Sequence, residues 1–370
     1  MRIMKKPQRC GIRSGHWKAR TEEMEKWYEQ VRMEPGNNYI SSRIRLVRNC
    51  ADQCFPNRLK GQDSLRLIET MRTRLEDIGA VEGETMSSCL LSDLPDAARD
   101  AMRERRVLNA GILQKKTPVG LMLSESEDIS LVLNGDDHFR LQVLAPNSHL
   151  YELWEKAGRL DDYINERFSY AFDDRYGYLT SFPTNVGTGM RANIVVHLPA
   201  LSTGKQFPNL LASMNRFGVT VRGVYGTGKE NYGALYDVSN AKTLGMSERE
   251  ILDLVSKVAA QLNSEENQVR RKSLESHRLE REDEAFKSYG LLKYARKLSL
   301  RDALSYLSQV IAGITDGIVR TEEPACLYRL YLGVQSSNLI AGATMPVDRE
   351  KLDAVRADYI REQLPELKEV

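Results

Sequence analysis

The chain has 370 residues, with 53 Lys and Arg against 51 Asp and Glu, which leaves a formal net charge of +2. Nucleic-acid coats and polybasic membrane arms need a clear surplus of one sign, so this balance argues against nucleic acid and membranes as partners. Hydrophobic residues make up 41%, which is ordinary for a folded protein. No apolar run approaches the roughly 18 residues of a membrane span, and the start of the chain lacks the apolar core of a signal peptide. We therefore expect a cytoplasmic protein.

Five scattered cysteines are an odd number in a long chain, which favours reduced thiols over a disulfide framework. Cys50 and Cys54 are four residues apart, but no second Cys or His pair follows at zinc-finger spacing. The sequence therefore predicts no metal held by the protein alone.

The pattern along the chain predicts three parts. Residues 1–36 read as a polar, basic N-terminal extension, and residues 37–265 alternate strand-like with helix-like segments. Connections are short around 218–240 and long elsewhere, which favours a mostly antiparallel sheet flanked by helices, an α+β fold. A capping box at Ser247-Glu-Arg-Glu250 opens a helix, and residues 266–370 are predicted to form a helical C-terminal domain.

Arginine occupies the polar side of several predicted strands. Residues 40–46, 138–143, 191–198 and 218–222 alternate apolar with polar side chains, so one face of each strand is buried and the other faces a cleft. Arginine forks toward phosphate oxygens in two-point contacts. A single strand arginine is better explained by a surface ion pair, but a set of five predicts an anion site. The five are Arg43, Arg45, Arg140, Arg191 and Arg222.

Two loops also have phosphate-binding features. Gly187 and Gly189 precede a predicted strand, where backbone N–H groups could approach an anion, although a plain turn is the simpler explanation of these glycines. Residues 223–229 match the spacing of a Walker A loop, but Glu230 stands where Ser or Thr should bind magnesium, and a predicted strand follows. We therefore reject the P-loop interpretation.

Two carboxylates lie at the start of one predicted strand, where Asp136 and Asp137 precede His138 and Arg140. Neighbouring carboxylates can hold a guanidinium group and accept its proton as it attacks phosphorus. An aspartate-rich turn is the simpler alternative for this segment taken alone.

Taken together, these segments resemble the phosphagen (guanidino) kinase family, and within it the bacterial protein arginine kinase branch. The resemblance runs from about residue 37 to residue 245. It is carried by Ser41-Ser-Arg-Ile-Arg-Leu46, Asp137-His-Phe-Arg140, Tyr178-Leu-Thr180, Pro183-Thr-Asn-Val-Gly-Thr-Gly-Met-Arg-Ala192 and Arg222-Gly-Val-Tyr-Gly226.

The resemblance implies Mg-ATP as phosphoryl donor, with Mg²⁺ carried by the nucleotide, and a guanidinium nitrogen as acceptor. In the arginine kinase branch the acceptor is an arginine of a protein, so protein substrates with accessible arginines are the implied partners. The branch also implies a homodimer formed through C-terminal helices and a AAA+ protease that receives the marked proteins. Whether a zinc-binding activator pairs with this chain stays open.

Carried over by position, the resemblance assigns catalysis to Asp136, Asp137 and Arg191, with Asp136 as the base. It assigns nucleotide binding to Ser41, Ser42, Arg43, Ile44, Arg45, Arg140, Arg191, Ala192, Asn193, Ile194, Val195, Arg222, Gly223, Val224, Tyr225, Gly226 and Thr227.

The chain departs from the family pattern where the guanidinium would be handled. Gly135 and Asp136 stand in place of two glutamates, and Thr227 in place of a loop glutamate. Phe182 replaces a cysteine, and Ile112 aligns with a histidine that lies against the nucleotide. Loss of a positioned base typically costs about 10²-fold or more in rate. These changes threaten catalysis more than ATP binding.

A C-terminal motif that binds phosphoarginine in the arginine kinase branch reads Leu352-Asp-Ala-Val-Arg-Ala357 here. It keeps Asp353 and Arg356, the implied phosphoarginine-binding residues, and lacks the first arginine. The apolar spacing of Leu304, Leu307 and Ile311, continued by Ile314, fits either a dimer interface or an intradomain core.

Three functions follow from this pattern. The leading one is a protein arginine kinase that marks proteins for proteolysis. The alternative is a catalytically impaired relative that acts as a nucleotide- or phosphoarginine-binding adaptor. A kinase of small guanidines is weaker, because the chain lacks the all-helical N-terminal domain of that branch.

Overall fold

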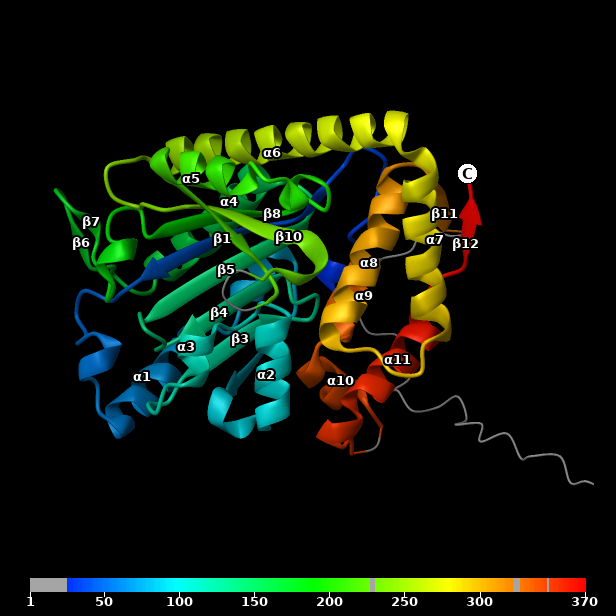
Figure 1. Cartoon of the computed structure of the whole chain (residues 1–370). Coiled ribbons are helices and arrows are strands. Elements are labelled where there is room, and N and C mark those ends of the chain that lie inside the picture. Colours follow the sequence, from blue (N-terminus) through cyan, green and yellow to red (C-terminus); the bar gives the residue numbers. More distant parts are fainter. Residues whose placement is uncertain (1–24, 227–229, 322–326, 345) are drawn as a thin grey trace, which may run out of the picture.

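The structure, a computed structural model, describes residues 25–226, 230–321, 327–344 and 346–370. Its centre is an eight-stranded sheet in the order β2-β3-β4-β5-β1-β8-β10-β9, and every neighbouring pair is antiparallel (Figure 1). This confirms the predicted α+β fold with an antiparallel sheet. The strands are β1 Tyr39–Arg48, β2 Met86–Leu90, β3 Gly120–Ser124, β4 Ile129–Leu133, β5 Phe139–Pro146, β8 Met190–His197, β9 Val219–Gly223 and β10 Leu235–Asn240.

Helices cover one face of this sheet, where alternate residues of β1 and β8, such as Ile44 and Ile194, join the largest hydrophobic core. The covering helices are α4 Leu150–Asn165, α5 Phe207–Arg216 and α6 Glu248–Ser276. The predicted capping box at the start of α6 is present, since Ser247 N–H donates to Glu250 Oε2 at 2.7 Å and Ser247 Oγ accepts from Glu250 N–H at 3.2 Å.

The remaining shorter elements lie near the β2–β4 end of the sheet or in the connecting segments of the chain. The helices there are α1 Gly61–Arg74, α2 Asp96–Glu104 and α3 Ala110–Leu113. A two-stranded ribbon pairs β6 Phe172–Asp173 with β7 Gly177–Tyr178. Single 3₁₀ turns are η1 Trp27–Glu29, η2 Pro56–Arg58, η3 Ile78–Glu82, η4 Leu91–Asp93, η5 Pro183–Asn185, η6 Leu201–Thr203, η7 Tyr232–Ala234 and η8 Arg349–Lys351.

The C-terminal region covers part of the opposite face of the sheet. Its elements are α7 Arg278–Tyr294, α8 Leu300–Thr315, α9 Leu327–Gly333, α10 Ser336–Gly342 and α11 Leu352–Gln363, with a ribbon of β11 Val319–Thr321 and β12 Leu367–Glu369. Leu304, Leu307 and Ile311 are buried in a core that also contains Val195 of β8 and Leu235 of β10. The apolar stripe of α8 is therefore intradomain core, so it gives no support to a dimer interface.

Helix α6 and side-chain contacts cross the predicted domain limits at residues 265 and 36. The limit at residue 265 falls inside α6, and the turn to α7 lies at His277. Arg270, in the second half of α6, is buried and donates to Asp316 Oδ1 at 2.7 Å and to Asn38 Oδ1 at 2.7 Å. Trp27, in the part of the N-terminal extension that is described, is 1% exposed in the same core as the C-terminal helices. Residues 25–36 thus pack as part of the folded body.

No helix among the described residues has the length and apolar character needed to span a membrane. Within the same residues, Cys50, Cys54 and Cys89 are free thiols.

Candidate active site

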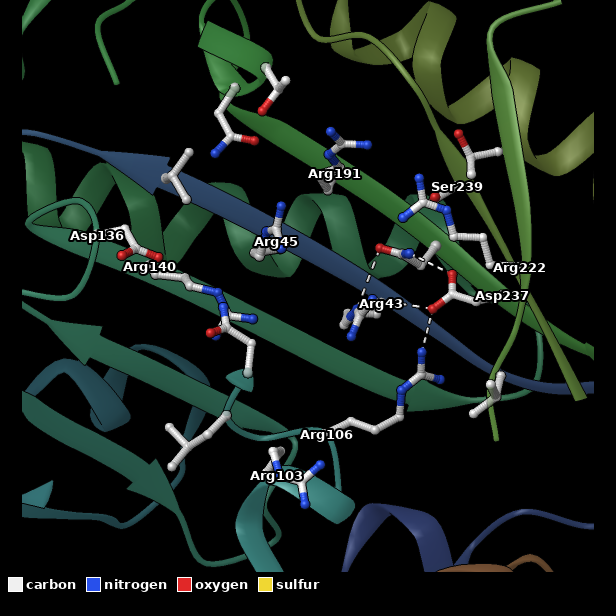
Figure 2. Close-up of a pocket in the computed structure, with 18 of the residues that line it drawn as sticks. Arg43, Arg45, Arg103, Arg106, Asp136, Arg140, Arg191, Arg222, Asp237 and Ser239 are labelled. Atoms are coloured by element: carbon white, nitrogen blue, oxygen red, sulfur yellow. Dashed lines mark hydrogen bonds and ion pairs between the residues drawn. The ribbon is translucent and has the colours of Figure 1, made fainter. Parts of the chain in front are cut away.

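A cavity of about 690 Å³ opens on the face of the sheet that the α4–α6 layer leaves uncovered. Its floor is formed by β1, β5, β8, β9 and β10, and the end of α2 forms one side (Figure 2). All five arginines predicted from strand alternation line this cavity. Two further arginines, from α2 and the residues after it, join them. The set is Arg43, Arg45, Arg103, Arg106, Arg140, Arg191 and Arg222.

Two of these arginines face each other directly, because Arg45 of β1 is in register with Arg191 of β8. Like charges at opposed positions of an antiparallel pair destabilise the sheet. Burial, and after it the charges of Arg140 and Arg191, lowers the pKa of Arg45 to about 9. Burial and then Arg43 lower the pKa of Arg140 to about 10. Both guanidinium groups stay charged at neutral pH, and the cavity holds a concentration of positive charge that an anion would relieve.

Several guanidinium N–H groups in this cavity are also unpaired. Arg45 Nε and both Nε and Nη1 of Arg140 are buried atoms without a hydrogen-bond partner. Buried donors are normally satisfied, and an orphaned one needs an explanation. Phosphate oxygens are acceptors that match a guanidinium fork, so these residues fit a polyphosphate.

Asp237 of β10 is the carboxylate at the centre of the cluster. Its Oδ2 contacts the guanidinium of Arg106 and lies 3.4 Å from Arg43 Nη2, while its Oδ1 accepts from Asn193 Nδ2 at 2.6 Å (Figure 2). Burial alone would raise the pKa of Asp237, but the charges of Arg106 and Arg43 outweigh it and lower that pKa. Asp237 is therefore an anion shared between two arginines.

The acidic end of the cavity contains both predicted catalytic carboxylates, in different environments. Asp137 is 2% exposed, and its Oδ1 accepts from Asn49 Nδ2 at 2.7 Å and from Ser181 N–H at 2.6 Å. Burial raises the pKa of Asp137. The side chain of Asp136 is 31% exposed, and Lys115 Nζ lies 4.0 Å from its Oδ1. Asp137 thus holds the 181 loop in place, whereas Asp136 presents a more accessible carboxylate.

Ile112 does not lie where the alignment with a nucleotide-contacting histidine places it. It is 2% exposed and packs in a small core with Val132 and Leu108 instead of lining the cavity. Leu108 and Asn109 reach the cavity from this side, as does Phe182 from the opposite loop. Ile112 therefore belongs to the hydrophobic packing beside the cavity.

Only part of the predicted nucleotide-binding set lines the cavity. Besides the five arginines, Asn193, Gly223, Val224 and Tyr225 do so. Ser42, Ile44, Ala192 and Ile194 alternate with the arginines and point to the other face of the sheet, whereas Val195 shares the face of the arginines and packs in the core of the C-terminal helices. The buried residues that do not line the cavity are Ser41, Ser42, Ile44, Ala192, Ile194 and Val195. Gly226 also lies outside the lining, and Thr227 lies outside the described residues.

The two loop glycines serve backbone packing instead of an anion. A Cβ on Gly187 would lie 2.3 Å from the carbonyl oxygen of Thr243, and one on Gly189 would lie 2.7 Å from that of Val47. Both have positive φ, 108° and 63°. Glycine is therefore required by the turn, as the simpler interpretation of the sequence held.

Asp353 and Arg356 lie together in α11, but their environment is that of a structural pair. Arg356 is 2% exposed and donates to the carbonyl oxygens of Leu298 and Val334, each at 2.8 Å, and to Asp353 Oδ1 at 2.6 Å. A phosphoarginine would have to compete with these partners.

Sequence reasoning missed several residues that line the cavity. Asp237 alternates with Tyr236 and Val238 in β10, a pattern that could have shown that it faces the cavity. Arg103, Arg106 and Gln335 have no such signal, because they reach the cavity through the packing of α2 and the residues before α10. Among the described residues, no group of three or more His, Cys, Asp or Glu side chains could hold a metal ion.

Two family descriptions match the chain. The ATP:guanido phosphotransferase C-terminal catalytic domain matches residues 66–269, and the protein-arginine kinase McsB C-terminal domain matches residues 277–370. A protein-arginine kinase of Caldanaerobacter subterraneus is 34% identical over 325 residues, covering 88% of this chain and 96% of that relative. This chain belongs to the protein-arginine kinase family.

Other members of the protein-arginine kinase family are similarly close. Those of Halalkalibacterium halodurans and Bacillus subtilis are 36% and 34% identical, each over 88% of this chain and over 91% and 89% of their own lengths. Among solved structures, a lombricine kinase has a TM-score of 0.55 at 21% identity, covering 69% of this chain and 72% of that one. A duplicated taurocyamine kinase of Schistosoma mansoni has a TM-score of 0.57 at 22% identity, covering 64% and 34%. These likenesses show a shared fold.

Proposed function

We propose that this protein transfers the γ-phosphoryl group of ATP to arginine side chains of protein substrates. The observation that carries the proposal is the cavity in which arginines from four strands surround one space, with Asp136 at its edge. Membership of the protein-arginine kinase family over most of the chain supports it.

The arginine cluster would hold the triphosphate. Arg45 and Arg140 have buried N–H groups without partners, so they can donate to phosphate oxygens at no cost in existing hydrogen bonds. Arg43, Arg191 and Arg222 complete the positive lining. Charge stabilisation of this kind supplies most of the catalytic effect in phosphoryl transfer, because the reaction needs little covalent help from the protein.

Magnesium would neutralise phosphate charge and would arrive with the nucleotide, whose oxygens are its preferred ligands. The protein itself would hold the triphosphate in one orientation and exclude others. The nucleoside would lie toward residues 223–225, where Val224 and Tyr225 line the cavity.

Asp136 is the proposed base. The attacking guanidinium nitrogen forms a bond to the γ-phosphorus, the bond from that phosphorus to the bridging oxygen breaks, and ADP leaves. The nitrogen's proton passes to the carboxylate of Asp136, which is the more accessible of the two aspartates. Asp137 keeps the adjoining loop in shape through Asn49 and Ser181.

The comparisons do not favour the impaired-adaptor alternative, since the relatives that match over most of the chain are named as kinases. A homodimer, a AAA+ protease that receives the product and a zinc-binding activator are drawn from the resemblance. A cytoplasmic location, expected from the composition and the apolar pattern of the sequence, belongs to the same proposal. So does a division into an N-terminal extension, a catalytic domain and a C-terminal domain near residues 36 and 265. Phosphoarginine binding by Asp353 and Arg356 is proposed with them.

The direct test offers two acceptors in parallel. The protein is incubated with Mg-ATP and either an unfolded protein or free arginine, ADP release is measured, and products are read by mass spectrometry under non-acidic conditions. We expect phosphoarginine on the protein substrate. ADP release that depends on free arginine and leaves the protein unmodified would instead identify a small-guanidine kinase, and no phosphoarginine on either acceptor would refute the proposal.

A further inference from the structure

Arg106 connects two distant members of the arginine cluster through its backbone. Its φ is 70°, a left-handed conformation that is uncommon for a residue other than glycine. Its carbonyl oxygen accepts a hydrogen bond from Gln142 Nε2 at 2.9 Å, and Gln142 Oε1 accepts from Arg140 Nη2 at 3.3 Å. Gln142 is fully buried, so the unusual backbone at 106 is tied to the orientation of Arg140.

The side chain of Arg106 reaches the other end of the cluster. It pairs with Asp237 Oδ2, the same oxygen that lies 3.4 Å from Arg43 Nη2. Asn193 completes the arrangement, because its Nδ2 donates to Asp237 Oδ1 at 2.6 Å and its Oδ1 lies 3.4 Å from Arg43 Nε. Arg43 is thus held at two nitrogens by groups that Arg106 helps to fix.

The position of Arg106 is itself set by the C-terminal region. Glu104 accepts from the N–H groups of Ser337 and Asn338 at 3.0 and 2.8 Å. Arg105 donates to Asn338 Oδ1 at 2.8 Å and pairs with Glu127 through two hydrogen bonds of 2.8 and 3.0 Å. Glu104 and Arg105, which immediately precede Arg106, are thus held in place by the C-terminal region and by Glu127.

We infer that Arg106 and Asp237 are positioning residues that orient Arg43 and Arg140 for a bound triphosphate. The inference rests on the proposed function, which places a triphosphate in this cavity. A carboxylate among cationic groups weakens anion binding by simple Coulomb repulsion. The presence of Asp237 at the centre of the cluster is therefore explained by the geometry it imposes on its arginine partners.

The direction in which one substitution changes the affinity for a polyanion distinguishes an effect of geometry from an effect of charge. Asp237→Asn makes the cavity more positive, so electrostatics alone predicts tighter binding of a polyanion. Loss of orientation predicts weaker binding. The probe is inorganic tripolyphosphate, which has no ribose or base and therefore reports on the phosphate-binding arginines alone. Affinity is measured by isothermal titration calorimetry on the full chain.

We expect Asp237→Asn to weaken tripolyphosphate binding at least fivefold and Asp237→Glu to recover part of the loss. The double variant Arg106→Gln/Asp237→Asn removes both charges and leaves the net charge unchanged, so it serves if the single variant does not fold. It too should bind at least fivefold more weakly. Arg99→Gln, on α2 and outside the cavity lining, is the matched control and should bind like the wild type.

In turnover, Asp237→Asn should raise KM for ATP more than it lowers kcat. Unchanged or tighter tripolyphosphate binding by the folded variants would overturn the inference. This failure differs from a failure of the proposed function: tripolyphosphate binding that depends on Asp237 in a protein that makes no phosphoarginine would refute the kinase activity and leave the positioning role standing.

Discussion

The side chain of Ile112 fills the space that a side chain at position 135 would need. A Cβ on Gly135 would lie 2.8 Å from Cδ1 of Ile112 and 3.1 Å from Cγ1 of Val132. Gly135 has no positive φ, so space and not backbone conformation excludes a larger residue. Gly135, which stands where the family pattern has a glutamate, thus lies directly against Ile112.

This contact predicts an interaction between two substitutions. Gly135→Ala alone should lower the free energy of unfolding by about 1–3 kcal/mol through overpacking. Ile112→Val removes the Cδ1 atom itself and should cost about 1 kcal/mol alone. The double variant should be more stable than the sum of the two losses predicts, as measured by urea unfolding. Simple additivity would show that the contact does not limit position 135.

Arg140 should bind phosphate at the expense of stability. Its guanidinium is buried with two unpaired nitrogens, and burial lowers its pKa to about 10. Arg140→Met should therefore raise the free energy of unfolding of the ligand-free protein by about 1–3 kcal/mol, because replacing an uncompensated buried charge with an apolar side chain removes its desolvation cost.

The same variant should bind ATP roughly 10²-fold more weakly, since charge-assisted hydrogen bonds to phosphate are lost. Thermal unfolding without ligand and calorimetry with Mg-ATP measure the two effects. A variant that is less stable and binds ATP normally would contradict the assignment of Arg140 to the phosphates.

Strand alternation explains how much of this site could be predicted from the sequence. The period of a strand fixes which side chains share a face, and it correctly assigns Arg43, Arg45, Arg140 and Arg191 to the face that lines the cavity. The resemblance, in contrast, assigned whole segments to the nucleotide, and half of each strand segment, such as Ile44 and Ile194, belongs to the core.

Tertiary packing decided what the sequence could not reveal. Arg106 reaches the cavity because α2 is anchored on the C-terminal region, and no local pattern encodes that contact. Leu304 and its neighbours have the same spacing whether they form a core or an interface, so only the structure could assign them to the core. The second half of α6 likewise contacts the following region through Arg270 and Asp316, a contact that no local pattern encodes.

Stability should fall below neutral pH because of His197, which is fully buried with Nε2 2.7 Å from Ser308 Oγ. Burial, and then the charges of Arg270 and Arg281, lowers its pKa from 6.5 to about 3. Between pH 6.5 and about pH 3, His197 is therefore protonated in the unfolded chain and neutral in the folded one. The contribution is fully present above pH 6.5 and declines as pH falls toward 3.

His197 alone should thus account for about 2 kcal/mol of the stability lost between pH 7 and pH 5. His197→Gln should remove that part of the pH dependence in urea unfolding at the two pH values. His277→Gln, at an exposed histidine, is the control and should keep the wild-type dependence. Equal losses for the two variants would refute the role of His197.

Arg356 should be essential to the C-terminal fold whatever else it binds. Arg356→Ala leaves the carbonyl groups of Leu298 and Val334 without their donors in a buried site. An unsatisfied buried acceptor costs about 1–3 kcal/mol, so a loss of at least about 2 kcal/mol in urea unfolding is expected. Arg349→Ala, an exposed arginine in the preceding 3₁₀ turn, should change stability by less than about 0.5 kcal/mol. Comparable losses would show that the carbonyl contacts contribute little.

The most direct measurement compares the wild type with Asp136→Asn in a single assay of phosphoarginine formation on an unfolded protein, alongside ATP affinity. Asparagine keeps the shape of the side chain and cannot accept the proton. The proposed mechanism predicts phosphoarginine from the wild type, a loss of roughly 10²-fold or more in the variant, and ATP affinity unchanged within about threefold. Wild-type protein that binds ATP and forms no phosphoarginine, or a variant as active as the wild type, would contradict it.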